Sequence, residues 1–179
     1  MNEQDLLEGC CRNDRKAQEY LYNQYSGKLY VIALRYTKSQ QEAEDVIQEA
    51  FIKIFNKIGE FKRKSKLETW LTRVVINTAL NSQRSKLYMF PMADVSEINL
   101  EEDVSLARFE WQDLLKMIQS LPSGCQVIFN LFAIEGFNHN EIAEMLGISE
   151  GTSKSQYSRA KKLLKELISK NEMVKYERA

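Results

Sequence analysis

The stretch from His139 to Ser158 constrains the fold more than any other part of this 179-residue chain. It begins with apolar residues at the spacing of one helix face. It then reaches Gly147, where the chain can reverse because glycine readily adopts a positive φ. Ser149 can cap a second helix, with Thr152 three residues further on. The pattern predicts a helix-turn-helix.

The second of these helices has two distinct faces. Its apolar face consists of Tyr157, Ala160, Leu163, Leu164 and Leu167. Its polar, basic face consists of Thr152, Lys154, Ser155, Ser158, Arg159 and Lys162. A narrow cationic helix face of this kind fits the major groove of DNA. An ordinary amphipathic hairpin is the alternative, because glycine turns and basic faces also occur in helical bundles.

Composition favours an all-α fold, since the chain is 44% hydrophobic and has only two prolines and seven glycines. No apolar run is long enough to span a bilayer, and the polar, acidic start (MNEQDLLEG) is unlike a signal peptide. We therefore expect a cytoplasmic protein without direct membrane insertion. Cys10 and Cys11 are expected to be helix residues rather than a disulfide, and the three cysteines lack the spacing of metal ligands.

Charge is distributed in blocks although the formal net charge is zero. Residues 61–86 contain seven Lys or Arg and one acid, residues 89–113 seven acids and one base, and residues 148–179 eight bases and four acids. Two basic blocks can contact a polyanion at two places. The acidic block begins with a stretch that contains Pro91 and lacks a helical period. It predicts a linker, residues 89–103, between two small helical domains, 1–88 and 104–179.

The strongest pattern in the N-terminal domain predicts a helix over Gln40–Ile58, begun by a capping box of Ser39 and Glu42. Its apolar stripe is Ala43, Val46, Ile47, Ala50, Phe51, Ile54, Phe55 and Ile58. The helix dipole accounts for acids in the first turn. It does not account for Glu49, so a basic protein partner is an alternative explanation.

A further helix is predicted over Leu67–Lys86, begun by a capping box of Ser65 and Glu68. Its polar face carries Arg73, Asn77, Asn81 and Arg84. The preceding loop, Phe61–Lys66 (FKRKSK), concentrates positive charge beside an aromatic ring. Such a loop next to amide side chains suits an unstacked base of single-stranded nucleic acid. Trp70 is expected to be a core residue.

Three segments in this order, 43–55, 61–84 and 121–164, resemble the extracytoplasmic-function (group IV) sigma factors of bacterial RNA polymerase. The resemblance implies a transcription initiation factor with two helical domains that binds core RNA polymerase and directs it to promoter DNA. It further implies an anti-sigma factor as partner, and no enzymatic activity, cofactor, metal or small-molecule substrate.

The resemblance also assigns roles to residues. Docking on the clamp helices of the largest polymerase subunit would fall to Asp45, Gln48 and Glu49. Capture of an opened base of the −10 element would fall to Phe61, Lys62, Arg63, Lys64, Asn77 and Asn81. In the −35 element, bases would be contacted by Lys154, Ser155, Ser158 and Arg159, and phosphates by Thr152 and Lys162. The acidic linker would run through polymerase channels that otherwise hold nucleic acid.

The chain departs from the family pattern at several positions. Ser153 stands where the family usually has Val, which should weaken the apolar anchoring of the second helix, and Tyr157 replaces a usual Leu. Gln156 replaces a common Arg, and Cys125 a usual basic or aromatic residue. Trp70 supplies one indole where primary sigma factors have two, which implies a weaker duplex wedge and stringent promoters. These departures are expected to alter the −35 base preferences.

Two other classes of protein fit parts of the sequence. A stand-alone helix-turn-helix regulator explains residues 139–162 but gives the loop Phe61–Lys66 no role, and a helical scaffold does not explain two basic blocks. Catalysis has little support, because the only histidine, His139, has no cluster of possible metal ligands around it in the sequence. We expect His139 to be a solvated helix residue.

Overall fold

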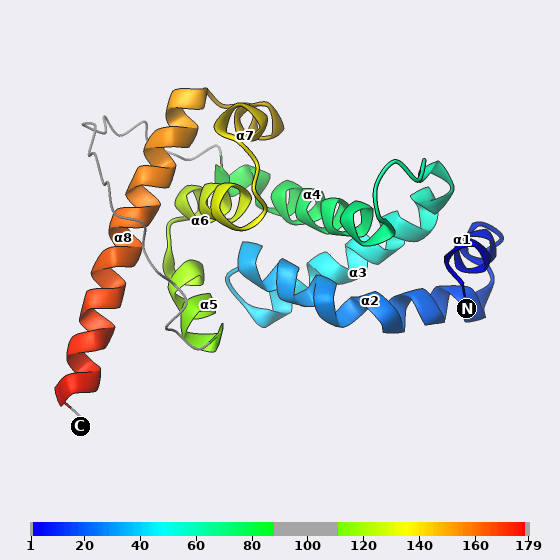
Figure 1. The fold of residues 1–179 in the computed structure, drawn as a ribbon, viewed down its shortest axis with the longest axis horizontal. Coiled ribbons are helices and arrows are strands. Elements are labelled where there is room, and N and C mark those ends of the chain that lie inside the picture. Colours follow the sequence, from blue (N-terminus) through cyan, green and yellow to red (C-terminus); the bar gives the residue numbers. More distant parts are fainter. Residues whose placement is uncertain (1, 88–110, 178–179) are drawn as a thin grey trace. The chain divides into compact units, whose positions relative to one another are not determined.

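The computed structural model describes residues 2–87 and 111–177, and all regular structure within them is helical. The chain divides into two compact units, residues 1–84 and 85–179. Figure 1 shows the helices of each unit. The predicted linker, 89–103, lies outside the described residues. Of the helices that the structure describes, none combines the length and apolar character needed to cross a membrane.

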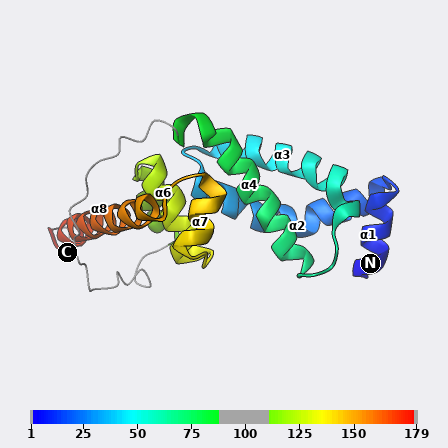
Figure 2. The same cartoon turned by 90° about the horizontal axis from the view of Figure 1, so that it is seen from above.

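The N-terminal unit consists of α1 (Glu3–Cys11), α2 (Arg15–Tyr36), α3 (Gln40–Lys57), the short 3-10 helix η1 (Ile58–Glu60) and α4 (Leu67–Leu87). Helices α2 and α3 pack along each other, and α1 packs against α2 and η1 (Figures 1 and 2). The approach of α1 to α2 requires a glycine, since a Cβ at Gly9 would lie 2.6 Å from the Ala17 Cβ.

Helix α4 is tied to both neighbouring helices by side-chain contacts as well as by its buried face. The Lys28 ammonium of α2 lies 3.2 Å from the Glu68 carboxylate, and Lys53 of α3 donates to Thr78 Oγ1 at 3.4 Å. Within residues 67–82 of α4, the buried residues are Leu67, Leu71, Val75, Ile76, Thr78, Ala79 and Leu80.

Of the two capping boxes predicted in this unit, the structure supports the serine cap of α3 and contradicts the box at α4. Ser39 caps α3 by accepting from the Glu42 N–H at 3.1 Å, as predicted, whereas the Glu42 carboxylate accepts from the Lys38 N–H at 2.9 Å. The capping box predicted from Ser65 and Glu68 is wrong. Helix α4 begins at Leu67, Ser65 Oγ donates to the Lys66 carbonyl at 3.4 Å, and the Glu68 carboxylate pairs with Lys28 instead.

The C-terminal unit consists of α5 (Trp111–Ser120), α6 (Ser123–Phe129), a π-helical turn η2 (Asn130–Ile134), α7 (His139–Leu146) and α8 (Glu150–Glu177). Helices α6 and α7 both pack against α8 (Figure 1). One core cluster joins α5, α6 and α8: Met117, Ile118, Leu121, Cys125, Phe129, Ala160 and Leu164.

The turn between α7 and α8 has the predicted local geometry. Gly147 has a φ of 68°, in the left-handed region that glycine adopts without strain. Ser149 Oγ accepts from the Thr152 N–H at 3.0 Å, which satisfies a backbone donor in the first turn of α8. Asn138 and Glu141 form a capping box at the start of α7, which the sequence reading missed.

Candidate nucleic-acid and polymerase interfaces

The exposed face of α3 carries the three residues expected to bind polymerase, Asp45, Gln48 and Glu49. Glu49 forms an ion pair with Lys53 at 2.6 Å, one turn further along. This pair explains why an acid can stand beyond the first turn, and it leaves Glu49 with a partner that a second protein would have to replace. Such exposed pairs stabilise a helix by only about 0.3–0.5 kcal/mol.

Ile52 is a candidate interface residue that the sequence reading missed. Its side chain is 62% exposed, the most of any large hydrophobic residue that the structure describes. It follows Gln48 by four residues and Glu49 by three, so all three lie on one face of α3. The signal was present in the sequence, because Ile52 does not belong to the apolar stripe that predicts the buried face.

The basic loop between η1 and α4 keeps its charged side chains in solvent. Lys62, Arg63 and Lys64 are all exposed. Arg63 has a φ of 54°, a left-handed backbone conformation that is uncommon outside glycine. Phe61 is half-buried, and its ring centroid lies 5.6 Å from that of Trp70, which is itself half-buried rather than the core residue expected.

One face of α4 joins this aromatic pair to the predicted amide side chains. Trp70, Arg73, Asn77 and Asn81 follow one another at intervals of three or four residues, so they lie in one row along the helix. Arg73, Asn77 and Asn81 are exposed. The structure therefore places the amides in line with the Phe61–Trp70 pair.

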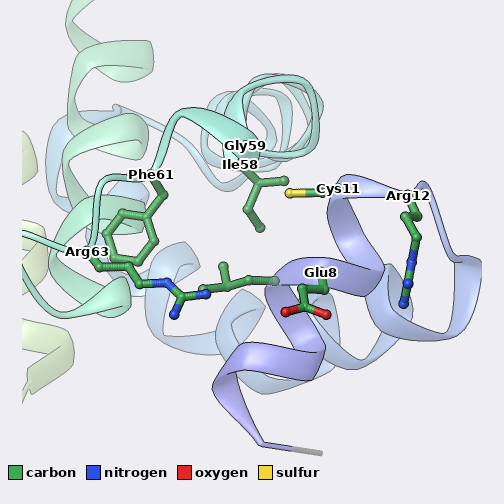
Figure 3. A pocket seen from close by; sticks show the side chains of 8 residues that line it. Glu8, Cys11, Arg12, Ile58, Gly59, Phe61 and Arg63 are labelled. Atoms are coloured by element: carbon green, nitrogen blue, oxygen red, sulfur yellow. The ribbon is translucent and has the colours of Figure 1, made fainter.

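An open pocket of about 320 Å³ lies on the α1 side of the same loop. Figure 3 shows Phe61 and Arg63 reaching it from the loop and Cys11 from α1, with Ile58 between them. Its remaining lining residues are Leu7, Glu8, Arg12 and Gly59. The sequence reading did not anticipate this pocket, since its two walls come from segments about 50 residues apart.

The predicted basic face of α8, residues 152–162, is accessible to a partner. Lys154, Arg159 and Lys162 are exposed, and Thr152, Ser155 and Ser158 are half-buried. Lys154 forms an ion pair with Glu150 at 2.7 Å, and the hydrogen bond and charge of Lys154 hold the pKa of Glu150 below its usual value. The hydroxyl of Ser155 donates to the Thr152 carbonyl at 3.0 Å, so its oxygen still presents acceptor lone pairs.

The inner side of α8 contains two buried polar residues. Ser153 is fully buried, and its Oγ lies 2.9 Å from Nδ1 of His139. Gln156 is 8% exposed, and its Oε1 accepts from Cys125 Sγ at 3.1 Å. Ser153, Gln156 and Cys125, three of the four residues of this unit that depart from the family pattern, are therefore members of polar pairs. Of the predicted apolar face, Ala160 and Leu164 are buried and the other members are half-buried.

The expectation that His139 is a solvated residue is wrong. Its ring is half-buried and stacks on Phe132, with centroids 4.3 Å apart and planes 14° apart. Burial, followed by the charge of Lys154, lowers the pKa of His139 below its ordinary value of 6.5. Near neutral pH the ring is therefore a neutral hydrogen-bonding partner.

Cys10 and Cys11 are helix residues, as predicted, and lie next to each other in α1. None of the three cysteines forms a disulfide. Burial, followed by the nearby Cys11 and Asp14, raises the pKa of Cys10 to about 11, which keeps this thiol protonated. The described residues contain no group of His, Cys, Asp and Glu arranged to hold a metal ion.

Comparison with known protein families identifies both units. The family model of Sigma-70 region 2 matches residues 21–87, and that of Sigma-70 region 4 matches residues 111–164. The RNA polymerase sigma-H factor of Pseudomonas aeruginosa is 31% identical over an alignment of 176 residues that covers 90% of this chain and 91% of that protein. The ECF RNA polymerase sigma-E factor of Escherichia coli is 29% identical over 178 residues, with 92% and 93% covered.

Solved structures share the fold. The sigma factor RpoE in complex with the anti-sigma factor NepR from Bartonella quintana matches with a TM-score of 0.54 at 21% identity, over 84% of this chain and 96% of that one. CnrH in complex with the cytosolic domain of CnrY matches with a TM-score of 0.51 at 21% identity, over 93% and 97%.

These matches define the class of protein as a sigma factor of bacterial RNA polymerase. More narrowly, the chain belongs to the extracytoplasmic-function group of the sigma-70 family. It is a transcription initiation factor that binds core RNA polymerase and directs it to specific promoters. The alternatives of a stand-alone regulator and a helical scaffold are thereby set aside.

Proposed function

We propose that the two units contact two promoter elements in different states of the DNA. The C-terminal unit would contact the −35 element as a duplex, and the N-terminal unit would hold the −10 element after it opens. The observation that carries this proposal is the contrast between their surfaces. One is a continuous basic helix face, and the other is a basic loop in line with aromatic and amide side chains. The corresponding domains are 1–88 and 104–179, joined by the acidic linker 89–103.

In the −35 element, α7 and α8 act as a helix-turn-helix with α8 in the major groove. Arg159 is exposed and suits bidentate contact with guanine. Lys154 must exchange its ion pair with Glu150 for DNA, so it adds less binding energy than its exposure suggests. Ser155 and Ser158 complete the base-contacting set, and Thr152 and Lys162 contact phosphates.

In the −10 element, an unstacked base is held beside the loop Phe61–Lys66. Unstacking and unpairing one base costs a few kcal/mol. The Phe61–Trp70 pair offers an aromatic surface, Asn77 and Asn81 offer donors and acceptors for base edges, and Lys62, Arg63 and Lys64 attract the phosphates.

Docking on core polymerase uses the α3 face. Asp45, Gln48 and Glu49 form its polar part and Ile52 its apolar centre, an arrangement that matches a basic helical partner with an apolar patch of its own. The acidic linker is proposed to occupy a basic channel of polymerase, where its charge substitutes for that of nucleic acid.

Other parts of the proposal follow from the family. The chain acts in the cytoplasm, where its polymerase partner is, and it performs no catalysis of its own. An anti-sigma factor is a further proposed partner, because the two solved structures cited above are complexes of this kind.

Run-off transcription with purified chain and core polymerase on a promoter library tests the proposal. Transcription should depend on both elements, and a pre-melted −10 bubble should bypass part of the need for the N-terminal unit. The free chain should bind DNA with a dissociation constant of only about 10⁻⁴–10⁻⁶ M, because core polymerase couples the two modest contacts. Nanomolar, sequence-specific binding by the free chain would contradict the proposal.

A further inference from the structure

One turn of α8, residues 153–156, is anchored from behind by two hydrogen bonds to two different elements. Ser153 Oγ lies 2.9 Å from His139 Nδ1, which belongs to α7. Gln156 Oε1 accepts from Cys125 Sγ at 3.1 Å, and Cys125 belongs to α6. Lys154 and Ser155, between the two anchors, point to the accessible side.

Apolar packing holds α8 against its core cluster, and hydrogen bonds add a directional constraint to that packing. A hydrogen bond weakens steeply with distance and angle, and a buried polar group left without a partner is costly. Rotation or translation of α8 would therefore break both pairs at once, and the two pairs together fix its orientation.

The imidazole that holds Ser153 is itself held in place. Its ring stacks on Phe132 of η2, and the Phe132 ring lies 4.5 Å from that of Tyr157, which belongs to α8. A ring fixed in this way presents Nδ1 in one direction, so the position of Ser153 follows from the packing of η2 and α7.

We propose that His139 and Cys125 are positioning residues that set how the basic face of α8 is presented to DNA. This inference rests on the proposed −35 role of α8 and goes beyond it by assigning a specificity function to residues that do not touch DNA. Base selectivity at the positions contacted by Lys154 and Ser155 then depends on two polar pairs behind the helix.

Transcription from a library of −35 sequences, with the full chain assembled on core polymerase, tests the proposal. Ser153→Ala should reduce discrimination at the base pairs contacted by Lys154 and Ser155 roughly two- to tenfold, the range expected for one lost neutral hydrogen bond. Cys125→Ala should reduce it by less, because a thiol is a weaker donor. His139→Phe keeps an aromatic ring on Phe132 and should have the same effect as Ser153→Ala. The double variant Ser153→Ala/His139→Phe should discriminate as well as either of its single variants, because both substitutions remove the same hydrogen bond.

Two controls separate positioning from general destabilisation. Cys125→Ser retains a donor of similar size and should preserve discrimination. Ser120→Ala removes a serine hydrogen bond of 2.7 Å that lies within α5, and it should leave discrimination unchanged even if it lowers Tm.

The hydrogen bond itself has a direct signature. Because the chain contains one histidine, the nitrogen resonances of its imidazole are unambiguous in protein without a histidine tag. Ser153→Ala should shift the Nδ1 resonance, and Ser120→Ala should not. An unshifted resonance would show that the Ser153 pair does not form and would overturn the proposal.

The transcription outcomes are also distinguishable. If Lys154→Ala and Arg159→Ala change −35 preferences but Ser153→Ala and Cys125→Ala change only Tm, the positioning role alone is overturned. If Lys154→Ala and Arg159→Ala leave the preferences unchanged, the −35 role fails and the positioning proposal fails with it.

Discussion

Helices α3 and α8 both carry proposed contact residues on their accessible faces, but their buried faces differ in chemistry. Every buried residue of α3 is apolar, and the residues proposed to bind polymerase are all exposed. In α8, two of the four buried residues within 150–169, Ser153 and Gln156, are polar and hydrogen-bonded. On α3, folding and binding are therefore separable, whereas on α8 the same contacts serve the core and the orientation of the basic face.

Charge reversal on α3 is the strongest test of this separation. Asp45→Lys combined with Glu49→Lys should weaken binding to core polymerase by at least about 100-fold, because like charges then face a basic partner. Tm should stay nearly unchanged, since Asp45 and Glu49 are exposed and the Glu49–Lys53 pair stabilises little. Co-purification with core enzyme and thermal unfolding measure the two quantities.

A matched control for charge reversal lies on α2. Glu19 is exposed in the same unit, and Glu19→Lys should leave binding to polymerase intact. Ile52→Ser should also weaken binding without lowering Tm, because its side chain is already in solvent. A loss of Tm in the variants of Asp45, Glu49 or Ile52 would show that folding and binding are coupled on α3 in the way proposed for α8.

Substitutions on the basic face of α8 separate base contact from phosphate contact. Arg159→Ala should cost about 1–3 kcal/mol of discrimination at one or two −35 base pairs. Lys162→Ala should weaken binding to all sequences and reduce the salt slope by about one unit. Selection from a promoter library with each variant measures the difference, and an unchanged base preference in Arg159→Ala would contradict the assigned face.

The sequence predicted α3 more completely than α8, for a physical reason. Apolar residues at spacings of three and four specify a buried face by themselves, so the bounds and the exposed acids of α3 followed directly. Gly147 and Ser149 fixed the turn before α8 in the same local way. The pairs of Ser153 with His139 and of Gln156 with Cys125 join residues 14 and 31 positions apart, which no local pattern encodes. The pocket beside Phe61 escaped prediction for the same reason.

In the N-terminal unit, binding of the opened −10 strand should also be separable from folding. Asn81→Ala should reduce open-complex formation on duplex promoters roughly two- to tenfold, the loss expected for one hydrogen bond to a base. A pre-melted bubble should recover part of the defect, and Tm should not change because Asn81 is exposed. Asn56→Ala, an exposed asparagine of α3, provides the control. Equal defects on duplex and bubble would count against the proposed capture site.

The smallest expected effect is a pH dependence confined to the C-terminal unit. Burial, followed by the charge of Lys154, lowers the pKa of His139 from its ordinary 6.5, so the unfolded chain takes up this proton at higher pH than the folded one. Stability is therefore fully present above about pH 6.5 and decreases as the pH falls below it.

The Tm of the wild type should fall by no more than about 4 °C between about pH 7.5 and about pH 5.5, because the imidazole is partly exposed. Thermal unfolding at the two pH values measures this. His139→Phe should lose less over the same interval, since it has no imidazole to protonate. The carboxylate of Glu150, whose pKa lies below 4.5 because of Lys154, stays ionised throughout this interval and does not contribute. An equal loss in both proteins would mean that the ring of His139 is as well solvated in the folded chain as in the unfolded one, and the coupling of α8 to α7 would then rest on the Phe132 stack alone.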